Sequence, residues 1–336
     1  MTTPPLGGTR EIIESLVSST GEADPVSAIR QKATRAIDSY VEVFGEPDSM
    51  PLDLLALASF LGIKKSDALP AFSPDAELTP DSDGGVEMRV NPDRPETRQR
   101  FSIGHEITHT FFPDHSSHVW TRADARYRDL SDPNDYLEML CDVGAAELVF
   151  PRRWFLEDAK TVDDAAKIVG LAARYKASRE ATVRRYAELH SERVAAIFFS
   201  WKLKPTQKGL VGRTDQANIF GITPQEEMDD ALRLRIDYAI LSHAFSASGS
   251  FLPRDKSIEN NGPLYQASAT GKPTDGDVYL ELGRASGNYR VHAIPLWTPA
   301  SNRGPRGENA IAAILRPRDV KKLKKIARPL APGLFD

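Results

Sequence analysis

The sequence predicts an α+β protein built from more than one domain. The chain has 336 residues, which is more than one domain usually contains. Strand-like runs at residues 70–94 lead into a helical segment that carries His-Glu-x-x-His at residues 105–109. Further predicted helices follow, and residues 194–318 then combine strand-like runs with glycine-rich turns. These patterns favour a helical domain with a small sheet, followed by a separate α/β module.

The N-terminal region is predicted to be mainly helical. Residues 1–24 are rich in Thr, Gly, Ser and Glu, and we expect a mobile tail with a short helix inside it. Apolar residues recur at helical spacing over residues 26–44, which predicts an amphipathic helix. A second helix is expected over residues 51–62, because Pro51 suits the start of a helix and Gly62 suits its end.

Two short strands are predicted next, one around Glu77 and the other over residues 86–90. The turn-forming residues Asp83, Gly84 and Gly85 lie between them. A small sheet is therefore expected beside the following helix. Its edge is a place where an extended peptide could add a strand.

The segment 97–112 is predicted to form a mostly buried helix, because apolar side chains surround its polar ones. Pro95 precedes this segment and Pro113 ends it, as expected at helix boundaries. Residues four apart lie on one face of a helix, so His105 and His109 direct two imidazoles toward one point. This is the arrangement of two ligands on a single zinc ion.

Glu106 follows the first histidine and can take a proton from a water on the metal. The alternative is a pair of core histidines that are satisfied by hydrogen bonds, since a buried ring nitrogen needs a partner. The intact spacing in a helical context favours a metal site. Zn²⁺ is the expected ion, although Mn²⁺ or Fe²⁺ also suit two imidazoles and a carboxylate.

A catalytic zinc site needs a third protein ligand and an open position. Asp114, His115 and His118 lie in a polar run just after the helix, which is typical of a solvated loop. Glu138 fits better, because it lies in an apolar segment over residues 136–151 that predicts a central helix. A carboxylate there is unfavourable unless it is paired or on a metal. We therefore predict Glu138 as the third ligand.

The same predicted helix carries other residues of interest. Asp142 lies four residues after Glu138, and we expect it to accept the free ring N–H of a ligand histidine. The small residues that begin at Gly144 would let this helix approach the first one closely. Cys141 is interpreted as a small buried core residue. Glu147 is interpreted as a surface or rim residue.

Two further helices are predicted over residues 161–175 and 178–190, and the stretch has helix-turn-helix character. Weak DNA contact through residues 171–190 is one interpretation, since the second helix carries Arg179, Arg184 and Arg185. The alternative is a pair of helices that pack on the preceding domain and leave a solvated charged face. The mildly acidic charge of the whole chain favours this alternative.

The C-terminal module is predicted to contain one long helix and several strands. The helix is expected from Thr223 to Phe245, because Thr223 and Glu226 have the spacing of a capping box. Residues 246–276 are predicted to be rich in loops. Strands are expected at residues 194–202, 278–282, 289–295 and 310–316, with a mobile hairpin tip at 301–307 and a tail after 318.

Composition limits the classes of partner and compartment. The net charge is −4, which provides no general attraction to nucleic acid or to an anionic membrane. The single cysteine excludes an internal disulfide and fits a reducing, cytoplasmic setting. No apolar run is long enough to span a bilayer, and residues 1–6 lack the basic-then-apolar pattern of a signal peptide.

Two strings of the sequence resemble the ImmA/IrrE family of zinc metallopeptidases. The first is Arg-Gln-Arg-Phe-Ser-Ile-Gly-His-Glu-Ile-Thr-His at residues 98–109. The second, at residues 138–151, is Glu-x-x-Cys-Asp-x-x-Ala-Ala-Glu-Leu-x-x-Pro. Asp142 departs from the pattern, because the family usually has Asn there. Either side chain can orient a neighbour.

Matching by position implies that His105, His109 and Glu138 hold the zinc and that Glu106 is the general base. The residue that assists the oxyanion is not identified by this match, and Tyr136 and His118 are the candidates for it. The expected fold is a zincin-like metallopeptidase domain, then a helix-turn-helix-like segment, then a C-terminal GAF-like sensor module. The corresponding boundaries are a tail at 1–24, the peptidase domain at 25–160, the middle segment at 161–192, the sensor module at 193–318 and a tail at 319–336.

The implied activity is that of a zinc-dependent endopeptidase. Its substrate would be a helix-turn-helix transcriptional repressor, whose cleavage switches on a stress or mobile-element response. The alternative is a DNA-associated regulator or sensor with a metal site that does not catalyse. Glu106 favours the enzyme, because a purely structural metal site has no need of a base beside its ligand.

Overall fold

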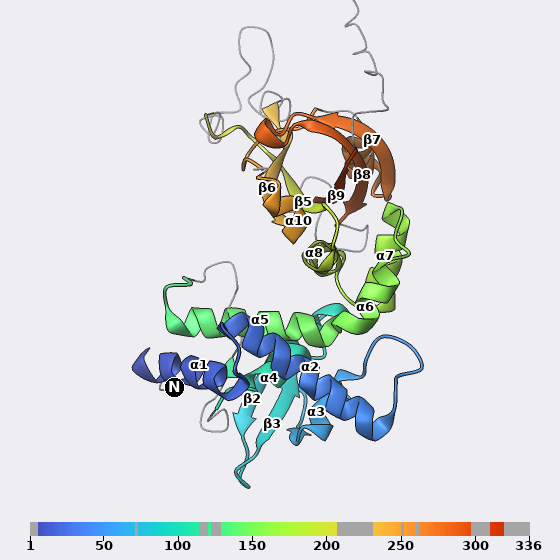
Figure 1. Ribbon diagram of the computed structural model, residues 1–336. Helices are drawn as coiled ribbons and strands as arrows, with labels where there is room; N and C mark the ends of the chain where they lie inside the picture. The colour runs from blue at the N-terminus through green and yellow to red at the C-terminus, as the bar shows by residue number, and fades with distance from the viewer. Residues whose placement is uncertain are drawn as a thin grey trace, which may run out of the picture. The chain divides into compact units, whose positions relative to one another are not determined.

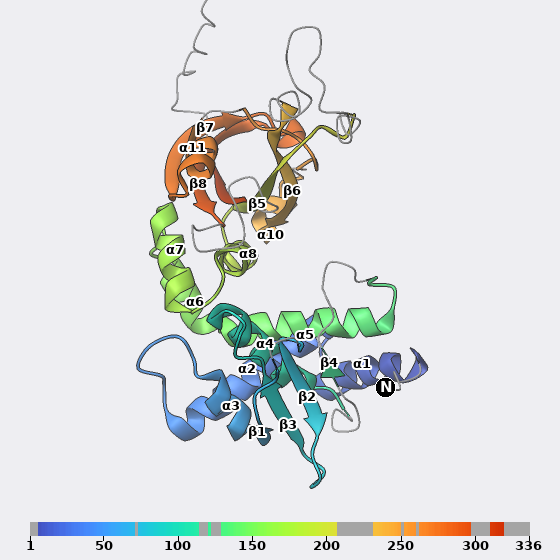
Figure 2. The ribbon, with the colours of Figure 1, turned by 180° about the vertical axis from the view of Figure 1, so that it is seen from behind.

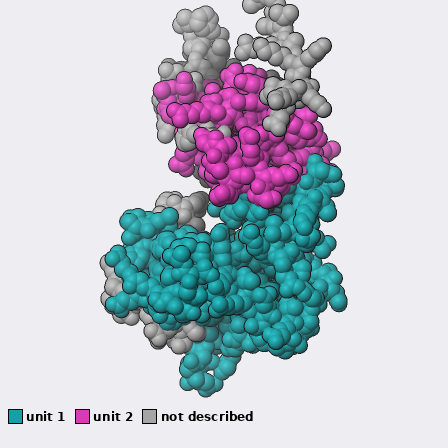
Figure 3. All heavy atoms as spheres, in the orientation of Figure 1, with its two compact units in different colours: residues 1–163, 167–189 teal, residues 164–166, 190–336 magenta. Residues whose placement is uncertain are grey.

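The chain folds into two units, which Figure 3 colours separately. The computed structural model describes residues 6–70, 73–113, 120–121, 129–206, 231–249, 252–259, 262–296 and 310–318. Unit 1 contains residues 1–163 and 167–189, and unit 2 contains residues 164–166 and 190–336. Each unit has its own sheet and helices, which confirms the predicted α+β class. None of the helices described here has the length and apolar composition needed to cross a membrane.

Unit 1 combines a small sheet with a set of helices (Figure 1). Its helices are α1 (Leu6–Thr20), α2 (Pro25–Phe44), α3 (Leu54–Phe60), α4 (Glu96–His109), α5 (Pro133–Val149), α6 (Arg152–Ala159), most of α7 (Ala165–Arg174) and α8 (Arg179–Leu189). Its strands are β1 (Ile63–Lys65), β2 (Ala76–Pro80), β3 (Val86–Val90) and β4 (Trp120–Thr121).

Residues 6–20 of the predicted tail form α1, so the helix expected there is confirmed, but it is longer than expected and packs against the rest of the unit. Ile12, Ile13 and Leu16 lie on one side of this helix and are buried. The hydroxyl of Thr9 donates a hydrogen bond to Asn134 on α5 over 2.8 Å. Burial of these apolar side chains gives the segment a fixed place against α2 and α5, despite its polar composition.

The next two helices confirm the predicted helical segments. Asp24 caps α2, and the buried residues of α2 lie on one face. Helix α3 begins at Leu54 rather than at Pro51, because the Asp53 carboxylate accepts the backbone N–H groups of Leu55 and Ala56. Gly62 follows α3 with a φ of +82°, a conformation that favours glycine.

The sheet of unit 1 has the order β1-β3-β2-β4. Strands β2 and β3 form the predicted antiparallel hairpin, and β1 pairs with β3 in parallel. The hairpin turn is fixed by Asp81, whose carboxylate accepts the N–H groups of Asp83 and Gly85, each over 2.8 Å. Helix α4 packs against β2 and β3 and also against α5, and it lies between them in Figure 1 and Figure 2.

Helices α4 and α5 approach each other closely at small residues. A Cβ atom added to Gly144 would lie 2.4 Å from the Thr108 Cγ2 atom. A Cβ atom added to Gly104 would lie 3.2 Å from the Ala145 Cα atom. The Thr108 side chain is buried and its hydroxyl donates to the Gly104 carbonyl over 2.8 Å, so it cannot readily turn aside. The predicted close approach is therefore confirmed.

Two predictions about charged residues are wrong. Glu147 is 4% exposed, and its carboxylate accepts both terminal N–H groups of Arg185, which is itself 2% exposed. Arg185 also donates to the Phe150 carbonyl over 3.2 Å. Glu147 is thus not a surface residue, and Arg185 does not contribute to an exposed basic face. Each charge can be buried because the other compensates it.

Unit 2 is built on a five-stranded antiparallel sheet of order β6-β5-β9-β8-β7. Helix α11 packs on β7, β8 and β9, and α10 packs on β6. Alternate residues of β5, namely Ala195, Ile197 and Phe199, enter a hydrophobic core of this unit. The elements of the unit are β5 (Ala195–Lys202), β6 (Arg233–Leu241), α10 (His243–Ala247), α11 (Gly262–Thr270), β7 (Thr274–Leu280), η4 (Gly283–Ala285), β8 (Gly287–Pro295) and β9 (Ile311–Pro317).

The four strands predicted for this unit are confirmed, but the long helix is not. Residues 233–241 form β6, which pairs with β5 along its whole length. The alternation Arg-Leu-Arg-Ile over residues 233–236 has the period of a strand, and Leu234 and Ile236 are buried as that period requires. Three predicted features lie outside the described residues. They are the start of the long helix, within 207–230, the hairpin tip at 301–307 and the tail at 319–336. The stretch predicted to be rich in loops contains α11.

Asp275 contacts two other parts of unit 2. Its carboxylate oxygens accept the backbone N–H of Ala165, at the start of α7, over 3.0 and 3.2 Å. The same carboxylate accepts a hydrogen bond from Nδ1 of His292, its partner across β7 and β8. Burial lowers the pKa of His292, so this ring is neutral near pH 7. The start of α7 is therefore anchored on the sheet of unit 2.

We expect Gly144→Ala to destabilise unit 1 by about 1–3 kcal/mol, because the new methyl group overpacks the contact with Thr108. Gly170→Ala on α7 is the matched control, since a Cβ there meets nothing within 4 Å. The control should stabilise the protein by up to about 1 kcal/mol. Urea unfolding followed by circular dichroism measures both. Equal effects of the two variants would contradict the close approach of α4 and α5.

We expect Glu147→Ala to destabilise unit 1 by about 3–5 kcal/mol, because it removes the nearest carboxylate from the buried Arg185 and leaves the longer contact with Glu188. Glu157→Ala is the control, because Glu157 and Lys160 form an exposed ion pair whose loss should change little. The midpoints of urea unfolding compare the two variants. A small effect at residue 147 would show that Arg185 is satisfied without Glu147.

Candidate metal centre

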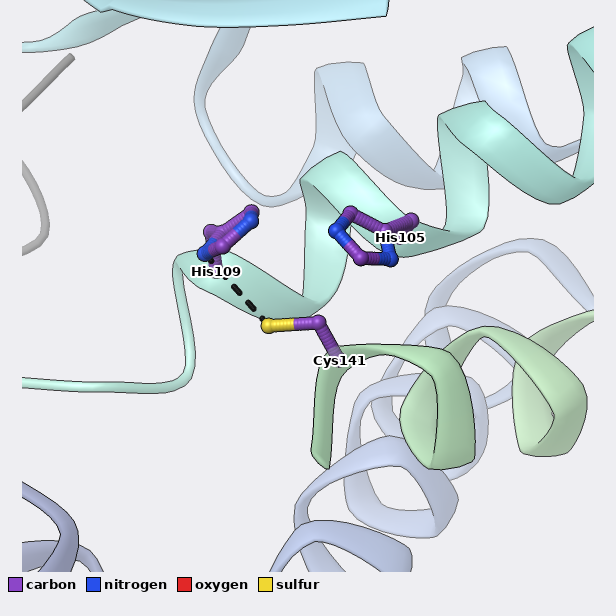
Figure 4. A group of neighbouring side chains, drawn as sticks. All are labelled: His105, His109 and Cys141. Atoms are coloured by element: carbon purple, nitrogen blue, oxygen red, sulfur yellow. Dashed lines mark hydrogen bonds between the residues drawn. The ribbon is translucent and has the colours of Figure 1, made fainter. Parts of the chain in front are cut away.

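The candidate site lies where α4 and α5 face each other. His105 and His109 are one turn apart on α4, and neither side chain is exposed to solvent. The centroids of the two rings are 4.9 Å apart, with an angle of 73° between the ring planes. Figure 4 shows both rings on the side of α4 that faces α5. The helix thus brings two buried imidazoles together, as the spacing predicts.

Glu138 on α5 contacts both rings. Its Oε2 atom lies 3.1 Å from Nε2 of His105, and its Oε1 atom lies 3.5 Å from Nε2 of His109. Ligand atoms that are 2.0–2.1 Å from one tetrahedral zinc ion lie about 3.3–3.4 Å from each other. Each of the two imidazole nitrogens therefore lies at about this distance from an oxygen of the same carboxylate. This donor set and its spacing fit a divalent ion.

Asp142 contacts the other nitrogen of the first histidine. Its Oδ1 atom lies 2.9 Å from Nδ1 of His105. A carboxylate can only accept here, so Nδ1 carries the proton that it shares with Asp142. In the neutral ring, Nε2 then keeps its lone pair on the side of Glu138. Such a contact fixes the ring orientation and raises the basicity of the ligand atom.

The electrostatics of this cluster favour a positive charge. Burial opposes charge on His105 and by itself lowers its pKa, but the hydrogen bonds and charges of Asp142 and Glu138 raise the pKa of His105 to about 9. A proton on the ring is stabilised by the two carboxylates. The same two carboxylates would stabilise a divalent cation in its place.

Cys141 offers a second possible ligand set. It is completely buried, as predicted, and its Sγ atom lies 3.4 Å from Nδ1 of His109 (Figure 4). The ligand atoms of His105, His109 and Cys141 all lie within 4.8 Å of one another. This contact is not among those predicted from the sequence. The signal was the spacing of residues 138, 141 and 142, which places all three on one face of α5.

Of the other predicted site residues, two lie in the described part of the chain and three do not. Glu106 is completely buried on α4, next to the first histidine. Tyr136 is half-buried on α5, two residues before Glu138. Asp114, His115 and His118 lie outside the described residues.

Residues 74–186 match the model of a peptidase family, M78, described as the IrrE N-terminal-like domain. The match begins before β2 and ends within α8, so it includes both helices of the metal centre. This chain carries an IrrE N-terminal-like domain. The resemblance to the ImmA/IrrE family is thereby confirmed.

No curated protein sequence matches the chain significantly. Among solved structures, a Mycobacterium tuberculosis transcriptional regulator is similar to it, with 12% sequence identity and a TM-score of 0.49. That alignment covers 93% of this chain and 80% of the other.

The distances predict that Glu138→Ala abolishes binding of one equivalent of Zn²⁺, because it removes the carboxylate shared by both imidazoles. Glu157→Gln is the control, since Glu157 is an exposed carboxylate on α6. Isothermal titration calorimetry of the full chain measures both variants. Unchanged zinc binding by Glu138→Ala would exclude Glu138 as a ligand and favour the set that contains Cys141.

Proposed function

We propose that this protein is a zinc-dependent endopeptidase. The observation that carries the proposal is the contact of one carboxylate, Glu138, with Nε2 of both His105 and His109. A glutamate follows the first of these histidines, which adds a base to the ligands. The match of residues 74–186 to a peptidase family supports the same class of reaction.

We assign the metal to His105, His109 and Glu138 rather than to the set with Cys141. Both ring nitrogens of His105 already face carboxylates, Glu138 at Nε2 and Asp142 at Nδ1. Cys141 faces Nδ1 of His109, whereas Glu138 faces Nε2 of that ring. Cys141 and Glu138 therefore contact different nitrogens of the His109 ring, and only Glu138 also contacts His105.

The side chains around this centre have separate roles in the proposed reaction. His105, His109 and Glu138 would hold the zinc ion, which would supply Lewis-acid chemistry to the scissile carbonyl and to water. Glu106 accepts the proton of the attacking water on a carboxylate oxygen and then delivers it to the leaving amine nitrogen. Asp142 holds the His105 ring in the tautomer with Nδ1 protonated. Of the two candidates to donate a hydrogen bond to the oxyanion, only Tyr136 lies in the part of the chain that the structure describes.

The proposed substrate is a helix-turn-helix transcriptional repressor, whose cleavage would switch on a stress or mobile-element response. This choice follows from the resemblance to the ImmA/IrrE family. We further propose that the domain at residues 193–318 is the sensor module. Its sheet and helices form a unit separate from the one with the metal centre, which supports a regulatory part that is distinct from the catalytic one.

The alternative of a DNA-associated regulator is less well supported. It requires an exposed basic face on α8, but Arg185 is buried against Glu147. Arg184 is exposed and Arg179 is half-buried, so the face is smaller than the sequence suggests. Because Arg185 is not exposed, fewer basic side chains can contact phosphates, and such contacts usually require several of them.

The variant Glu106→Gln distinguishes the peptidase proposal from the alternative of a DNA-associated regulator. We expect this variant to bind one equivalent of zinc as the wild type does, because the three ligands are intact. Its cleavage rate should fall about 10²–10⁴-fold, because the amide cannot accept the proton of the water. The measurement is incubation of zinc-loaded protein with candidate repressors of the host, followed by mass spectrometry of the fragments. Equal cleavage by both proteins would exclude Glu106 as the base.

A further inference from the structure

The two histidines of the metal centre differ in what their second ring nitrogen contacts. Nδ1 of His105 lies 2.9 Å from a carboxylate oxygen of Asp142, whereas Nδ1 of His109 lies 3.4 Å from the thiol sulfur of Cys141. The side chains of His105, His109 and Cys141 have no exposed surface, so bulk water does not reach the contact with the thiol. A carboxylate only accepts hydrogen bonds, but a thiol is both a weak donor and a weak acceptor.

We propose that Cys141 is a positioning residue for His109 that serves both neutral tautomers of its ring. With the proton on Nδ1, the ring donates to the sulfur and presents the lone pair of Nε2 to a metal. With the proton on Nε2, the thiol S–H donates to Nδ1. The change moves one proton between the two ring nitrogens, and none is gained or lost. This proposal rests on the proposed metal centre.

The surroundings of Nε2 of His109 explain why a partner that suits both tautomers of this ring is useful. Nε2 of His109 lies 3.5 Å from Oε1 of Glu138, which is an acceptor. Without a metal, Glu138 therefore favours the tautomer with the proton on Nε2, and Cys141 can accommodate that tautomer by donating. A carboxylate in the position of Cys141 could not donate. Asp142 thus favours the metal-binding tautomer of His105, whereas Cys141 allows His109 to adopt either tautomer.

The position of Cys141 on α5 supports a specific role rather than simple filling of space. Residues 138, 141 and 142 lie on one face of the helix, and each of the three side chains contacts a ring of the metal centre. Partners of ligand histidines usually change metal affinity by about 10–100-fold when they are removed. Because a thiol is a weak acceptor, we expect an effect at the lower end of that range.

The test compares Cys141→Ser with Cys141→Val in the full chain. Serine keeps a group that can donate and accept, whereas valine has a similar volume and can do neither. Competition with a chelator should give Cys141→Ser a zinc affinity close to that of the wild type. Cys141→Val should bind zinc about tenfold more weakly. If valine prevents folding, Cys141→Ala provides the variant without a hydrogen-bonding group. Equal affinities of the serine and valine variants would show that Cys141 only fills space.

Nuclear magnetic resonance of ¹⁵N-labelled histidine gives a second measurement that packing alone would not change. In the zinc-loaded wild type, Nδ1 of His109 should carry a proton protected from exchange, and this protection should be lost in Cys141→Val. A thiolate-to-metal charge-transfer band in the Co²⁺-loaded wild type would instead show that Cys141 is a ligand and would overturn the proposal. No substrate enters these measurements, so failure to cleave a repressor leaves this inference standing while it contradicts the proposed peptidase activity.

Discussion

The close approach of α4 and α5 is the constraint on which the metal centre depends. Helix α4 alone brings two imidazoles together, but the carboxylates assigned to the proposed site come from α5. Gly104 and Gly144 let the two backbones approach until a Cβ atom at either position would contact the other helix within 3.2 Å. Only at this separation can the short side chain of Asp142 reach Nδ1 of His105. Small residues at the contact therefore serve the chemistry as well as the packing.

Helix α5 also links the centre to the rest of unit 1. One face carries the side chains that contact the histidines, and a later turn carries Glu147, which contacts Arg185 of α8 and Arg30 of α2. Burying a glutamate and an arginine together is tolerable only when their hydrogen bonds are well formed. The geometry of this pair therefore restricts how α5 can shift along or rotate against its neighbours. A ligand set that needs spacing correct to a few tenths of an ångström benefits from such a restriction.

Local patterns in the sequence predict the helix of the two histidines, the β2–β3 hairpin and the partners on α5. A carboxylate on a mostly apolar helix needs a partner, and this requirement is the basis for predicting Glu138 as the third ligand. The ion pair of Glu147 and Arg185 could not be predicted, because its members are 38 residues apart and only tertiary folding joins them. The strand β6 was missed for another reason. The capping-box spacing at Thr223 indicates a helix start, whereas residues 233–236 alternate with the period of two that is typical of a strand.

X-ray absorption spectroscopy at the zinc edge tests the central claim most directly, because it reports the atoms bound to the metal in the full-length protein. The proposed centre predicts only nitrogen and oxygen neighbours at about 2.0–2.1 Å, with the outer-shell pattern of two imidazoles. Glu138→Ala should lose this signature, and Cys141→Ser should keep it. A sulfur neighbour at about 2.3 Å in the wild type would contradict the assignment and would place Cys141 on the metal.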